Sequence, residues 1–431
     1  MTDTLSLEQK STIMNTSPSN VLKNRNFRML WIGEGISLLG DQFYMIALPW
    51  LVLSLTGNAP AVGTVMAMAG IPRALFMLVG GALTDRFTPR RLMINSNLAR
   101  MVLTAVLAAL VTTNLIQLWM LYISALLFGL ADAFFFPAQT SIVPQLVSKG
   151  QLQQGNALIQ GTAMLSLFVG PVIAGALISR LDSSATHPTA GIALAIAIDS
   201  LSFIASVAML SLMRIENGNA HAEKDDKGVI ASIREGLLYM WNDRVLKIVF
   251  PITVGLNILI NGPFAVGIPV VARTRFPQGA AAFGLIMSLF GGGALLGIVL
   301  AGALPKPSKK TLGTISLSVL SVMGLGLVVI GITPTLYVAA AAALVMGTAN
   351  GYANINMITW LQQKVMPEMT GRVMSLVMFA AVGLNPISNT LAGALIGLNV
   401  TVLLVCAGAL MTMFTLSAAF SPVVRAGMGT D

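Results

Sequence analysis

The chain carries very little charge. Asp, Glu, Lys and Arg together make up 10% of its 431 residues, whereas hydrophobic residues make up 55% and the mean hydropathy is +0.82. A water-soluble fold of this length needs far more charge to cover its surface. The composition therefore excludes a soluble globular protein and indicates a chain embedded in a membrane, with apolar side chains facing lipid.

Residues that bind metals or perform covalent catalysis are also scarce. The one cysteine, Cys406, lies in an apolar segment and cannot form a disulfide within the chain. Both histidines, His187 and His221, fall in predicted loops, and no Cys and His cluster has the spacing of metal ligands. No phosphate-binding G-x-x-x-x-G-K-S/T sequence occurs. We therefore expect no metal site, no cofactor, no enzymatic activity and no ATP-driven step.

Long apolar segments fill most of the chain. About 20 helical residues cross a hydrocarbon layer about 30 Å thick, and weak alternation with abundant Gly and Ala favours packed helices over a β-barrel. We predict an all-α membrane protein with twelve transmembrane helices in two six-helix bundles. The predicted spans are 29–55, 60–83, 92–113, 117–138, 156–178, 190–213, 246–272, 279–303, 311–332, 335–358, 371–397 and 399–420.

Basic residues outside these spans gather on one side of the predicted membrane. Twenty lie in the two tails and in the loops on the same side, and three (Arg180, Arg273 and Arg275) lie opposite. The positive-inside rule then predicts a multi-pass protein of the cytoplasmic membrane with both termini in the cytoplasm. The same distribution accounts for the net charge of +9 without nucleic acid as a partner. We expect a monomer that contacts the lipid bilayer.

The central hydrophilic stretch is the one long break between apolar segments. Ile230, Ile233, Leu237 and Trp241 recur in it at helical spacing, which predicts an amphipathic helix on the inner membrane face. A plain linker is the alternative. The predicted parts of the chain are an N-terminal tail and bundle (1–213), this linker (214–245) and a C-terminal bundle and tail (246–431).

A motif joins the second span to the third, where residues 80–91 read Gly-Gly-Ala-Leu-Thr-Asp-Arg-Phe-Thr-Pro-Arg-Arg. It resembles the loop 2–3 signature of the major facilitator superfamily, G-x-x-x-D-R-x-G-R-R/K, with Thr88 and Pro89 in place of the usual Gly and first Arg. The resemblance implies two six-helix halves around a central cavity and alternating access. The matching residues are Gly81, Asp85, Arg86, Arg90 and Arg91.

A second motif lies in the fifth span, where Gly170-Pro171-Val172-Ile173-Ala174-Gly175 resembles the antiporter signature G-P-x-x-G-G of drug:proton exporters. The proline removes a backbone hydrogen bond, and the small residues permit close helix contact. Further fragments resemble the macrolide-efflux-like branch of the same superfamily. They include Leu39-Gly40-Asp41, Gly129-Leu130-Ala131-Asp132-Ala133 and Gly371-Arg372-Val373-Met374-Ser375.

These resemblances imply a function. They indicate export of hydrophobic small molecules, drug-like or macrolide-like, in exchange for protons. Three alternatives remain open: a siderophore exporter of the same fold, a lysophospholipid flippase of the same fold, and a membrane scaffold that transports nothing.

The resemblance also implies a latch at the cytoplasmic face. Asp85 would face the positive N-terminal end of the eleventh span at Gly371, and Arg86 or Arg90 would reach Asp132. Both contacts would hold the outward-open state and release when the inner gate opens. Contacts that are purely structural are the alternative.

Acidic residues within the spans occur only in the first half. Charges in hydrocarbon are costly and mark functional sites. At a rise of about 1.5 Å per residue, Asp41 and Arg73 lie about 16 Å and about 14 Å from the cytoplasmic face. We expect them to form an ion pair that alternates between paired and protonated states, as proton coupling requires; a static pair is the alternative. Glu34, on the same helix face as Asp41, and Asp199 are further proton-coupling candidates.

The second half offers amides in place of charges. Amides suit a cavity for neutral or weakly cationic amphiphiles, with contacts between helices as the alternative. The 25 methionines suit an adaptable apolar cavity. The predicted substrate-cavity residues are Asn257, Asn261, Asn350, Asn354, Asn385 and Asn389.

Overall fold

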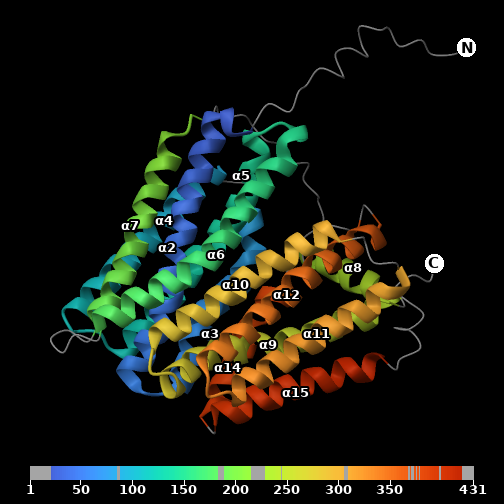
Figure 1. Ribbon diagram of the computed structural model, residues 1–431. Coiled ribbons are helices and arrows are strands. Elements are labelled where there is room, and N and C mark those ends of the chain that lie inside the picture. Colours follow the sequence, from blue (N-terminus) through green and yellow to red (C-terminus); the bar gives the residue numbers. More distant parts are fainter. Residues whose placement is uncertain are drawn as a thin grey trace, which may run out of the picture.

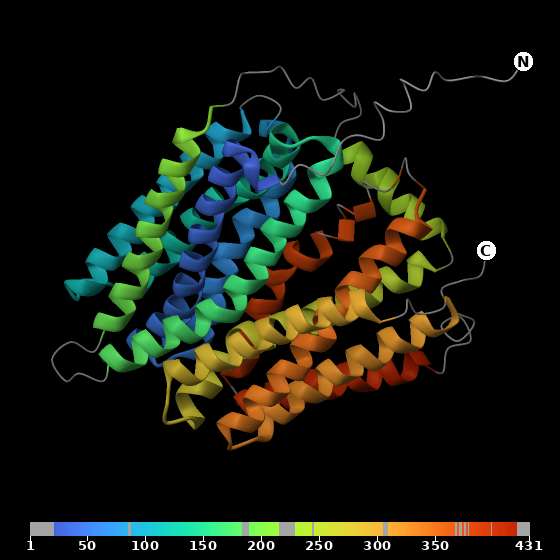
Figure 2. The same ribbon diagram turned by 45° about the horizontal axis from the view of Figure 1, so that its top comes forward.

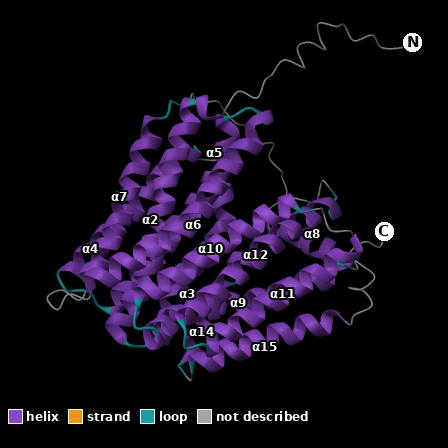
Figure 3. Ribbon diagram, in the orientation of Figure 1, coloured by secondary structure: helices purple, strands orange, loops and turns teal. Residues whose placement is uncertain are grey.

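The structure, a computed structural model, contains no strand in the part of the chain that it describes (Figure 3). Ten of its helices are long and apolar enough to cross a membrane, and two shorter apolar helices, Leu317–Ile332 and Val400–Leu416, match the predicted ninth and twelfth spans. An all-α membrane protein is therefore confirmed, while the count of twelve stays a prediction. The described residues are 21–84, 88–182, 189–214, 229–243, 245–304, 309–366, 369, 373–374, 376–377, 379–397 and 399–419.

Helices α2 to α7 form the N-terminal half, coloured blue to green in Figure 1. Local sequence sets their ends. The Asn24 side chain caps α2 by accepting from the backbone N–H groups of Asn26 and Phe27, and Gly57 ends it with a left-handed φ of 63°. The elements are η1 (Val21–Lys23), α2 (Arg25–Thr56), α3 (Ala59–Thr84), α4 (Pro89–Thr112), α5 (Leu118–Leu146), η2 (Lys149–Gln151), α6 (Leu152–Asp182) and α7 (Ala190–Leu212).

Helices α9 to α15 form the C-terminal half, coloured yellow to red in Figure 1. Arg275 ties three of them together, because its guanidinium donates to backbone oxygens at the end of α11, among them Gly331 O at 2.8 Å, and to Thr401 Oγ1 of α15 at 2.8 Å. A cation at a helix C-terminus is stabilising. The elements are α9 (Leu246–Arg275), α10 (Ala280–Ala303), α11 (Lys309–Ile332), α12 (Leu336–Lys364), the π-helical turn η3 (Phe379–Gly383), α14 (Asn385–Ile396) and α15 (Val400–Ala419).

The linker contains a helix, α8 (Val229–Asn242), which packs on the C-terminal half. Met240 is buried there, Tyr239 Oη accepts from the Met366 N–H at 3.4 Å, and Asp243 lies 3.7 Å from Lys364. Trp241 points outward with 70% of its surface exposed. The predicted helix is therefore present, and its contact with the membrane surface stays a prediction. The side chains of Ile230 and Ile233 lie outside the described residues.

The two halves touch along two seams at one end of the molecule. In the first, α6 packs on α10 so closely that a Cβ on Gly284 would lie 2.2 Å from the Pro171 carbonyl oxygen. In the second, α3 packs on α14, and a Cβ on Gly63 would lie 2.6 Å from the Cα of Gly393. From there the halves diverge toward the side where α2 begins and α15 ends (Figures 1 and 2). The backbones of the halves therefore meet at the end with the seams, which we call the closed end, and lie further apart at the other, which we call the open end.

Candidate functional site

Four charged side chains from four helices meet inside the N-terminal half. Arg73 of α3 forms an ion pair with one carboxylate oxygen of Asp132 of α5. Arg100 of α4 faces the other oxygen, with Nη1 3.3 Å from Asp132 Oδ1, and the same nitrogen lies 3.9 Å from Asp41 Oδ1 of α2. Two cations thus balance two carboxylates, which offsets part of the cost of burying them. We call these four residues the charged cluster.

Close packing of α3 on α5 explains the Arg73–Asp132 pair. A Cβ on Gly129 would lie 2.0 Å from the Ala69 carbonyl oxygen, so the two backbones touch where only glycine fits. Arg73 and Asp132 each follow this contact by about one helical turn. The glycine therefore brings the two side chains within reach of each other.

Arg100 is the fixed member of the charged cluster, since only 2% of its side chain is exposed. Its Cζ lies 4.1 Å from the ring centroid of Phe135 and 4.6 Å from that of Phe203, which are cation–π distances. Asn97 Oδ1 accepts a hydrogen bond from the guanidinium, and Asn97 Nδ2 donates to Ser206 Oγ at 2.9 Å. Aromatic rings and an amide thus hold this cation in one place.

The other three members of the charged cluster are more accessible. The exposed fraction of the side chain is 30% for Asp41, 21% for Asp132 and 39% for Arg73. Both carboxylates and Arg73 therefore form the accessible part of the cluster, while Arg100 supplies positive charge from the protein interior. This arrangement allows an acid to exchange a proton or a partner without moving the arginine.

Two further acids lie near the charged cluster but have different surroundings. Glu34 is 2% exposed and accepts a hydrogen bond from Gln139 Nε2 at 2.6 Å. Asp199 is fully buried, and among the described residues neither of its carboxylate oxygens has a hydrogen-bond partner. It lies where α7 crosses α2, because a Cβ on Gly40 would be 3.1 Å from Asp199 Oδ1. Asp41 follows that glycine directly, so the two acids are neighbours.

The expected pairing of Asp41 with Arg73 is wrong in this structure. Arg73 pairs with Asp132, and the cation nearest to Asp41 is Arg100. The depth of a residue along its helix gives its level in the membrane but not the direction in which its side chain points. The α3–α5 contact turns Arg73 toward Asp132 instead.

Only part of the predicted gating motif lies within the described residues. The structure does not describe Asp85, Arg86, Gly371 and Arg372. It describes Gly81 as part of α3 but not the surroundings of that residue. Arg90 donates through Nε to Leu210 O and through Nη2 to Ser211 O, each at 2.7 Å, and so caps the end of α7. It does not contact Asp132 in this structure, whose carboxylate is bound by Arg73 and Arg100. Arg91 begins α4.

The predicted antiporter motif lies at the first seam. A Cβ on Gly175 would lie 2.5 Å from the Ala280 carbonyl oxygen, and Pro171 faces Gly284. Gly170 instead packs inside its own half, against the Gln42 side chain of α2. The motif therefore places small residues where α6 meets the other half and where it meets α2.

The C-terminal half has an unusual contact between α9 and α14. The Ser388 hydroxyl accepts from the Gly262 N–H at 2.6 Å and donates to Ile258 O at 2.6 Å, two backbone groups that would bond each other in a regular helix. Pro263 follows and lacks an N–H. Insertion of a side chain and a proline are both recognised causes of a helix kink. The Ser388 side chain, inserted between these two backbone groups, fixes α14 against α9; we call it the Ser388 wedge.

Asparagine side chains lie on both sides of this wedge. Asn261 Nδ2 donates to Asn385 Oδ1 at 2.9 Å and to Asn257 Oδ1 at 3.2 Å. Asn389 lies one turn beyond Asn385 on α14 and is buried, with 8% of its surface exposed. The structure thus brings together four of the six asparagines predicted for the cavity. The other two, Asn350 and Asn354, lie on α12 and do not take part in the hydrogen bonds of this group.

A cavity of about 300 Å³ lies between the two halves, beside both seams. It is lined by side chains of α2, α3 and α6 from one half and of α9, α10 and α14 from the other. No charged side chain lines it. We call it the central cavity. Its lining residues are Met45, Pro49, Met66, Leu167, Asn261, Phe264, Ala265, Phe283, Met287, Phe290, Asn385 and Asn389.

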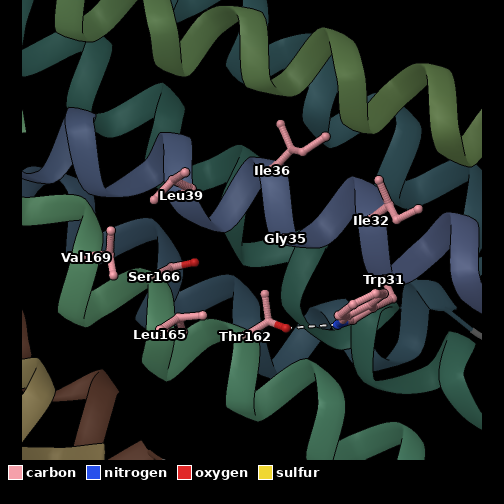
Figure 4. A pocket seen from close by; sticks show the side chains of 9 residues that line it. All are labelled: Trp31, Ile32, Gly35, Ile36, Leu39, Thr162, Leu165, Ser166 and Val169. Atoms are coloured by element: carbon pink, nitrogen blue, oxygen red, sulfur yellow. Dashed lines mark hydrogen bonds between the residues drawn. The ribbon is translucent and has the colours of Figure 1, made fainter. Parts of the chain in front are cut away.

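A second, apolar groove of about 360 Å³ lies between α2 and α6 within the N-terminal half (Figure 4). Trp31 Nε1 donates to Thr162 Oγ1 at 2.9 Å at one end of it, and Leu39 and Val169 lie at the other. It is the larger of the two, but it is lined by two helices of one half and carries no side-chain amide, whereas the central cavity is lined by helices of both halves and carries three asparagines. We therefore place the candidate transport site at the central cavity.

The sequence also contained functional-site residues that we did not predict. Arg100 lies about as deep as Asp132 and could have been paired with it by level, since Arg73 and Arg100 are the two basic residues that lie well inside the predicted spans rather than at their ends. Asn97 and Gln139 gave no such signal, because a single amide in an apolar helix is common. Ser388 gave none either, because its role depends on the approach of α9.

Two helical halves, a cavity between them and charges buried in one half define a class: membrane transporters of small molecules. The sequence profile of the Major Facilitator Superfamily matches residues 30–388. The chain therefore belongs to this family, and the resemblance expected from its motifs is confirmed.

Relatives and solved structures agree with this assignment. Macrolide efflux protein A of Streptococcus pyogenes is 24% identical over 378 residues, covering 86% of this chain and 90% of the relative. Multidrug efflux pump Tap of Mycobacterium tuberculosis (strain ATCC 25618 / H37Rv) is 27% identical over 392 residues, covering 86% and 88%. The nucleoside transporter NupG has a similar fold, with a TM-score of 0.71, 13% identity and coverage of 94% and 100%. A bacterial homologue of the iron transporter ferroportin in its inward-facing state gives a TM-score of 0.66, with 16% identity and coverage of 92% and 99%.

Proposed function

We propose that this chain exports hydrophobic, drug-like small molecules from the cytoplasm in exchange for protons. The observation that carries the proposal is that the titratable groups and the cavity occupy different places: the titratable groups gather in the N-terminal half, and an uncharged cavity lies between the two halves. The names of the efflux relatives support the substrate class. The proposal includes location in the cytoplasmic membrane with both termini in the cytoplasm.

The charged cluster and the central cavity lie along the same helix faces, which supports coupling between them. Met45 of the cavity follows Asp41 by four residues on α2, and Met66 precedes Arg73 by seven on α3. Residues at these spacings share one face of a helix. A change of charge at Asp41 is therefore felt close to the bound substrate.

Charge balance indicates how protons take part. Arg73 and Arg100 already have Asp132 and Asp41 as counter-ions, so charged Glu34 and Asp199 would add two unbalanced charges to the interior. An unpaired buried charge is far more costly than a neutral, protonated carboxyl. We propose that Asp41 exchanges the transported proton, with Glu34 and Asp199 as further carriers.

Alternating access would move residues 1–213 against residues 246–431, with 214–245 as the connection. With cytoplasmic termini, the open end of this structure faces the cytoplasm. In that state the proposed latch is released, which is compatible with an Arg90 that does not reach Asp132. The contact of Asp85 with the helix end at Gly371 remains part of the proposal.

Substitution of Asp41 by Asn tests the proposal in proteoliposomes with an imposed pH gradient and a panel of hydrophobic drugs. We expect Asp41→Asn to abolish uphill transport while downhill exchange of the same drug continues, because the cavity is intact. Asp243→Asn, which removes an acid outside the N-terminal half, is the matched control and should transport normally. Uphill transport at the wild-type rate in Asp41→Asn would rule out Asp41 as an essential carrier.

One observation favours a lipid substrate as a second candidate. The α2–α6 groove is apolar and long enough to hold part of an acyl chain, and its Ile32 and Ile36 are exposed. A lysophospholipid flippase would use such a groove. A fluorescent lysophospholipid in the same panel decides this: its translocation, with no drug transported, would favour the flippase.

A further inference from the structure

Three asparagine side chains form a hydrogen-bonded row that runs from α9 to α14 and ends at the central cavity. Asn257 Nδ2 donates to the Thr253 carbonyl oxygen at 2.9 Å, and Asn257 Oδ1 accepts from Asn261 Nδ2 at 3.2 Å. Asn261 Nδ2 also donates to Asn385 Oδ1 of α14 at 2.9 Å. Asn261 and Asn385 line the cavity, whereas Asn257 is not among its lining residues. We call these three asparagines the amide row.

The Thr253 carbonyl oxygen fixes the direction of the whole amide row. A carbonyl oxygen only accepts, so Asn257 must turn its NH2 group toward it and its own oxygen toward Asn261. For the same reason Asn261 turns its NH2 group toward the oxygens of both neighbours, and both hydrogens of that group are used. Two atoms are left over, Asn261 Oδ1 and Asn385 Nδ2, and among the described residues no group bonds either of them.

Both leftover atoms have surface that a molecule in the cavity can reach. Asn261 and Asn385 are partly exposed. In the part of the chain that the structure describes, neither leftover atom is one of the unpartnered atoms that are closed off from solvent, whereas Asn389 Oδ1 is. The oxygen and nitrogen of one amide are about 2.3 Å apart, so the free acceptor and the free donor lie at most about 7.5 Å from each other. The cavity therefore presents an acceptor and a donor close together.

The neighbouring residues hold this pair of amides in place. The Ser388 wedge accepts from the N–H of the residue that follows Asn261. Pro386 follows Asn385 and packs on α3, where a Cβ on Gly70 would lie 2.8 Å from the proline ring. The two amides are thus preorganised, and preorganised polar groups discriminate strongly between ligands.

The remaining wall of the cavity is apolar and adaptable. Met45, Met66 and Met287 accommodate many shapes. Phe264 and Phe290, whose ring centroids are 4.6 Å apart, offer flat surfaces for rings. Such a wall selects for apolar surface but hardly for shape, so polar selectivity must come from the two accessible amides.

We propose that the central cavity binds apolar molecules through an amide-like group, which has an N–H donor beside a carbonyl acceptor. Asn261 Oδ1 accepts from the N–H, and Asn385 Nδ2 donates to the carbonyl oxygen. Amides and lactams are then preferred to the matching esters, which keep the carbonyl but have an oxygen in place of the N–H. This inference rests on the proposed function, because it names a substrate class of the same cavity.

Procainamide and procaine provide the comparison, because they differ only in the amide N–H, which is an ester oxygen in procaine. Procaine is the more hydrophobic of the two, so apolar contacts alone would favour it. Binding to the purified full chain in detergent is measured by equilibrium dialysis, and proton-driven uptake is measured in proteoliposomes. We expect wild type to bind procainamide about tenfold more tightly, because the ester oxygen of procaine would face Asn261 Oδ1, acceptor against acceptor.

Substitutions at the two amides should have different effects, which a purely structural role would not produce. Asn261→Leu should reduce the difference to less than twofold, chiefly by weakening binding of procainamide. Asn385→Leu should weaken binding of both compounds about fivefold and leave the preference, because both carry the carbonyl group. Asn257→Leu is the matched control: it removes hydrogen bonds of the amide row outside the cavity and should keep the wild-type preference. If Asn261→Leu is unstable, Asn261→Ser serves in its place, since its shorter side chain also withdraws the acceptor.

Equal affinity of wild type for both compounds, tighter binding of procaine, or binding of neither would overturn the inference, as would a tenfold preference that survives in Asn261→Leu. Failure of the proposed function looks different. Selective binding of procainamide without any proton-driven uptake of it would sink the transport proposal and leave amide recognition by the cavity intact.

Discussion

At the scale of single residues, Asp132 has the most demanding position in the N-terminal half. Both arginines within the membrane face its carboxylate, Arg73 at one oxygen and Arg100 at the other. Loss of one acid therefore leaves two cations short of a counter-charge. Asp41, 3.9 Å from Arg100, cannot replace it for both.

We predict that Asp132→Asn destabilises the protein by about 3 kcal/mol, because breaking a buried ion pair leaves an uncompensated buried charge. The measurement is thermal unfolding of the purified protein. Asp243→Asn removes the Asp243–Lys364 pair at the end of α12 and should cost at most about 1 kcal/mol. Equal, small losses in both variants would show that the aromatic rings and Asn97, rather than Asp132, hold Arg100.

Sequence alone could identify these charges but not their partners. Asp41, Arg73 and Asp132 stand out because each is charged in an apolar segment. Their pairing depends on which helices touch, and that is decided by a single glycine, Gly129, against Ala69. A contact of this kind leaves no periodic pattern in the sequence. The cavity asparagines were recognisable as polar residues within spans, but the same signal also selected Asn350 and Asn354 of α12, which do not line the central cavity.

At the scale of helices, the seams depend on residues without side chains. Gly175 and Gly284 in the first seam and Gly63 and Gly393 in the second bring backbones into direct contact. In lipid, helices associate through such close packing rather than through the hydrophobic effect. The seams thus allow the halves to meet closely without locking them by charge.

We predict that Gly284→Ala opens the closed end and slows transport. Its new Cβ would lie 2.2 Å from the Pro171 carbonyl oxygen, a backbone atom that cannot turn aside. If the substitution raises the free energy of the conformation with this end closed by about 1.4 kcal/mol, the ratio of closed to open molecules already falls tenfold. Spin labels at Leu181 and Tyr337, both exposed, report the distance across this end after Cys406→Ser removes the native thiol.

Gly161→Ala is the matched control, since a Cβ at that position on α6 meets nothing within 4 Å. It should leave both the distance and the transport rate unchanged. A Gly284→Ala protein with the wild-type distance distribution would show that the seam gives way without opening, and would contradict the prediction.

Helix positions could be predicted well where apolar segments end at charges or turns. The sixth span was expected at 190–213 and α7 is Ala190–Leu212. The eleventh span was expected at 371–397, and within it η3 and then α14 follow each other. Pro386 at the start of α14 is the local signal for this break, but hydropathy does not register it because both pieces are apolar.

At the scale of the whole molecule, orientation in the membrane decides what the open end means. The uneven distribution of basic residues predicts that this end faces the cytoplasm. If the orientation were reversed, the same conformation would be open to the outside.

We predict that a cysteine introduced by Asn219→Cys, in the Cys406→Ser background, resists a membrane-impermeant thiol reagent applied to intact cells. The residue lies in the central linker, which the charge distribution places inside. Labelling after the cells are permeabilised is the control for reactivity. Ready labelling of intact cells would reverse the orientation and would place the open end of this conformation on the outside.

The π-helical turn η3 determines the direction in which the side chains of the following helix, α14, point around the helix axis. A π-helical turn holds one residue more than the α-helical turn it replaces, and each residue of an α-helix advances the side chains by about 100°. Without the extra residue, Asn385 and Asn389 would turn away from the central cavity and other side chains of α14 would enter it. During evolution, the gain or loss of one residue within Phe379–Gly383 could therefore replace the polar wall of the cavity without a single substitution in it.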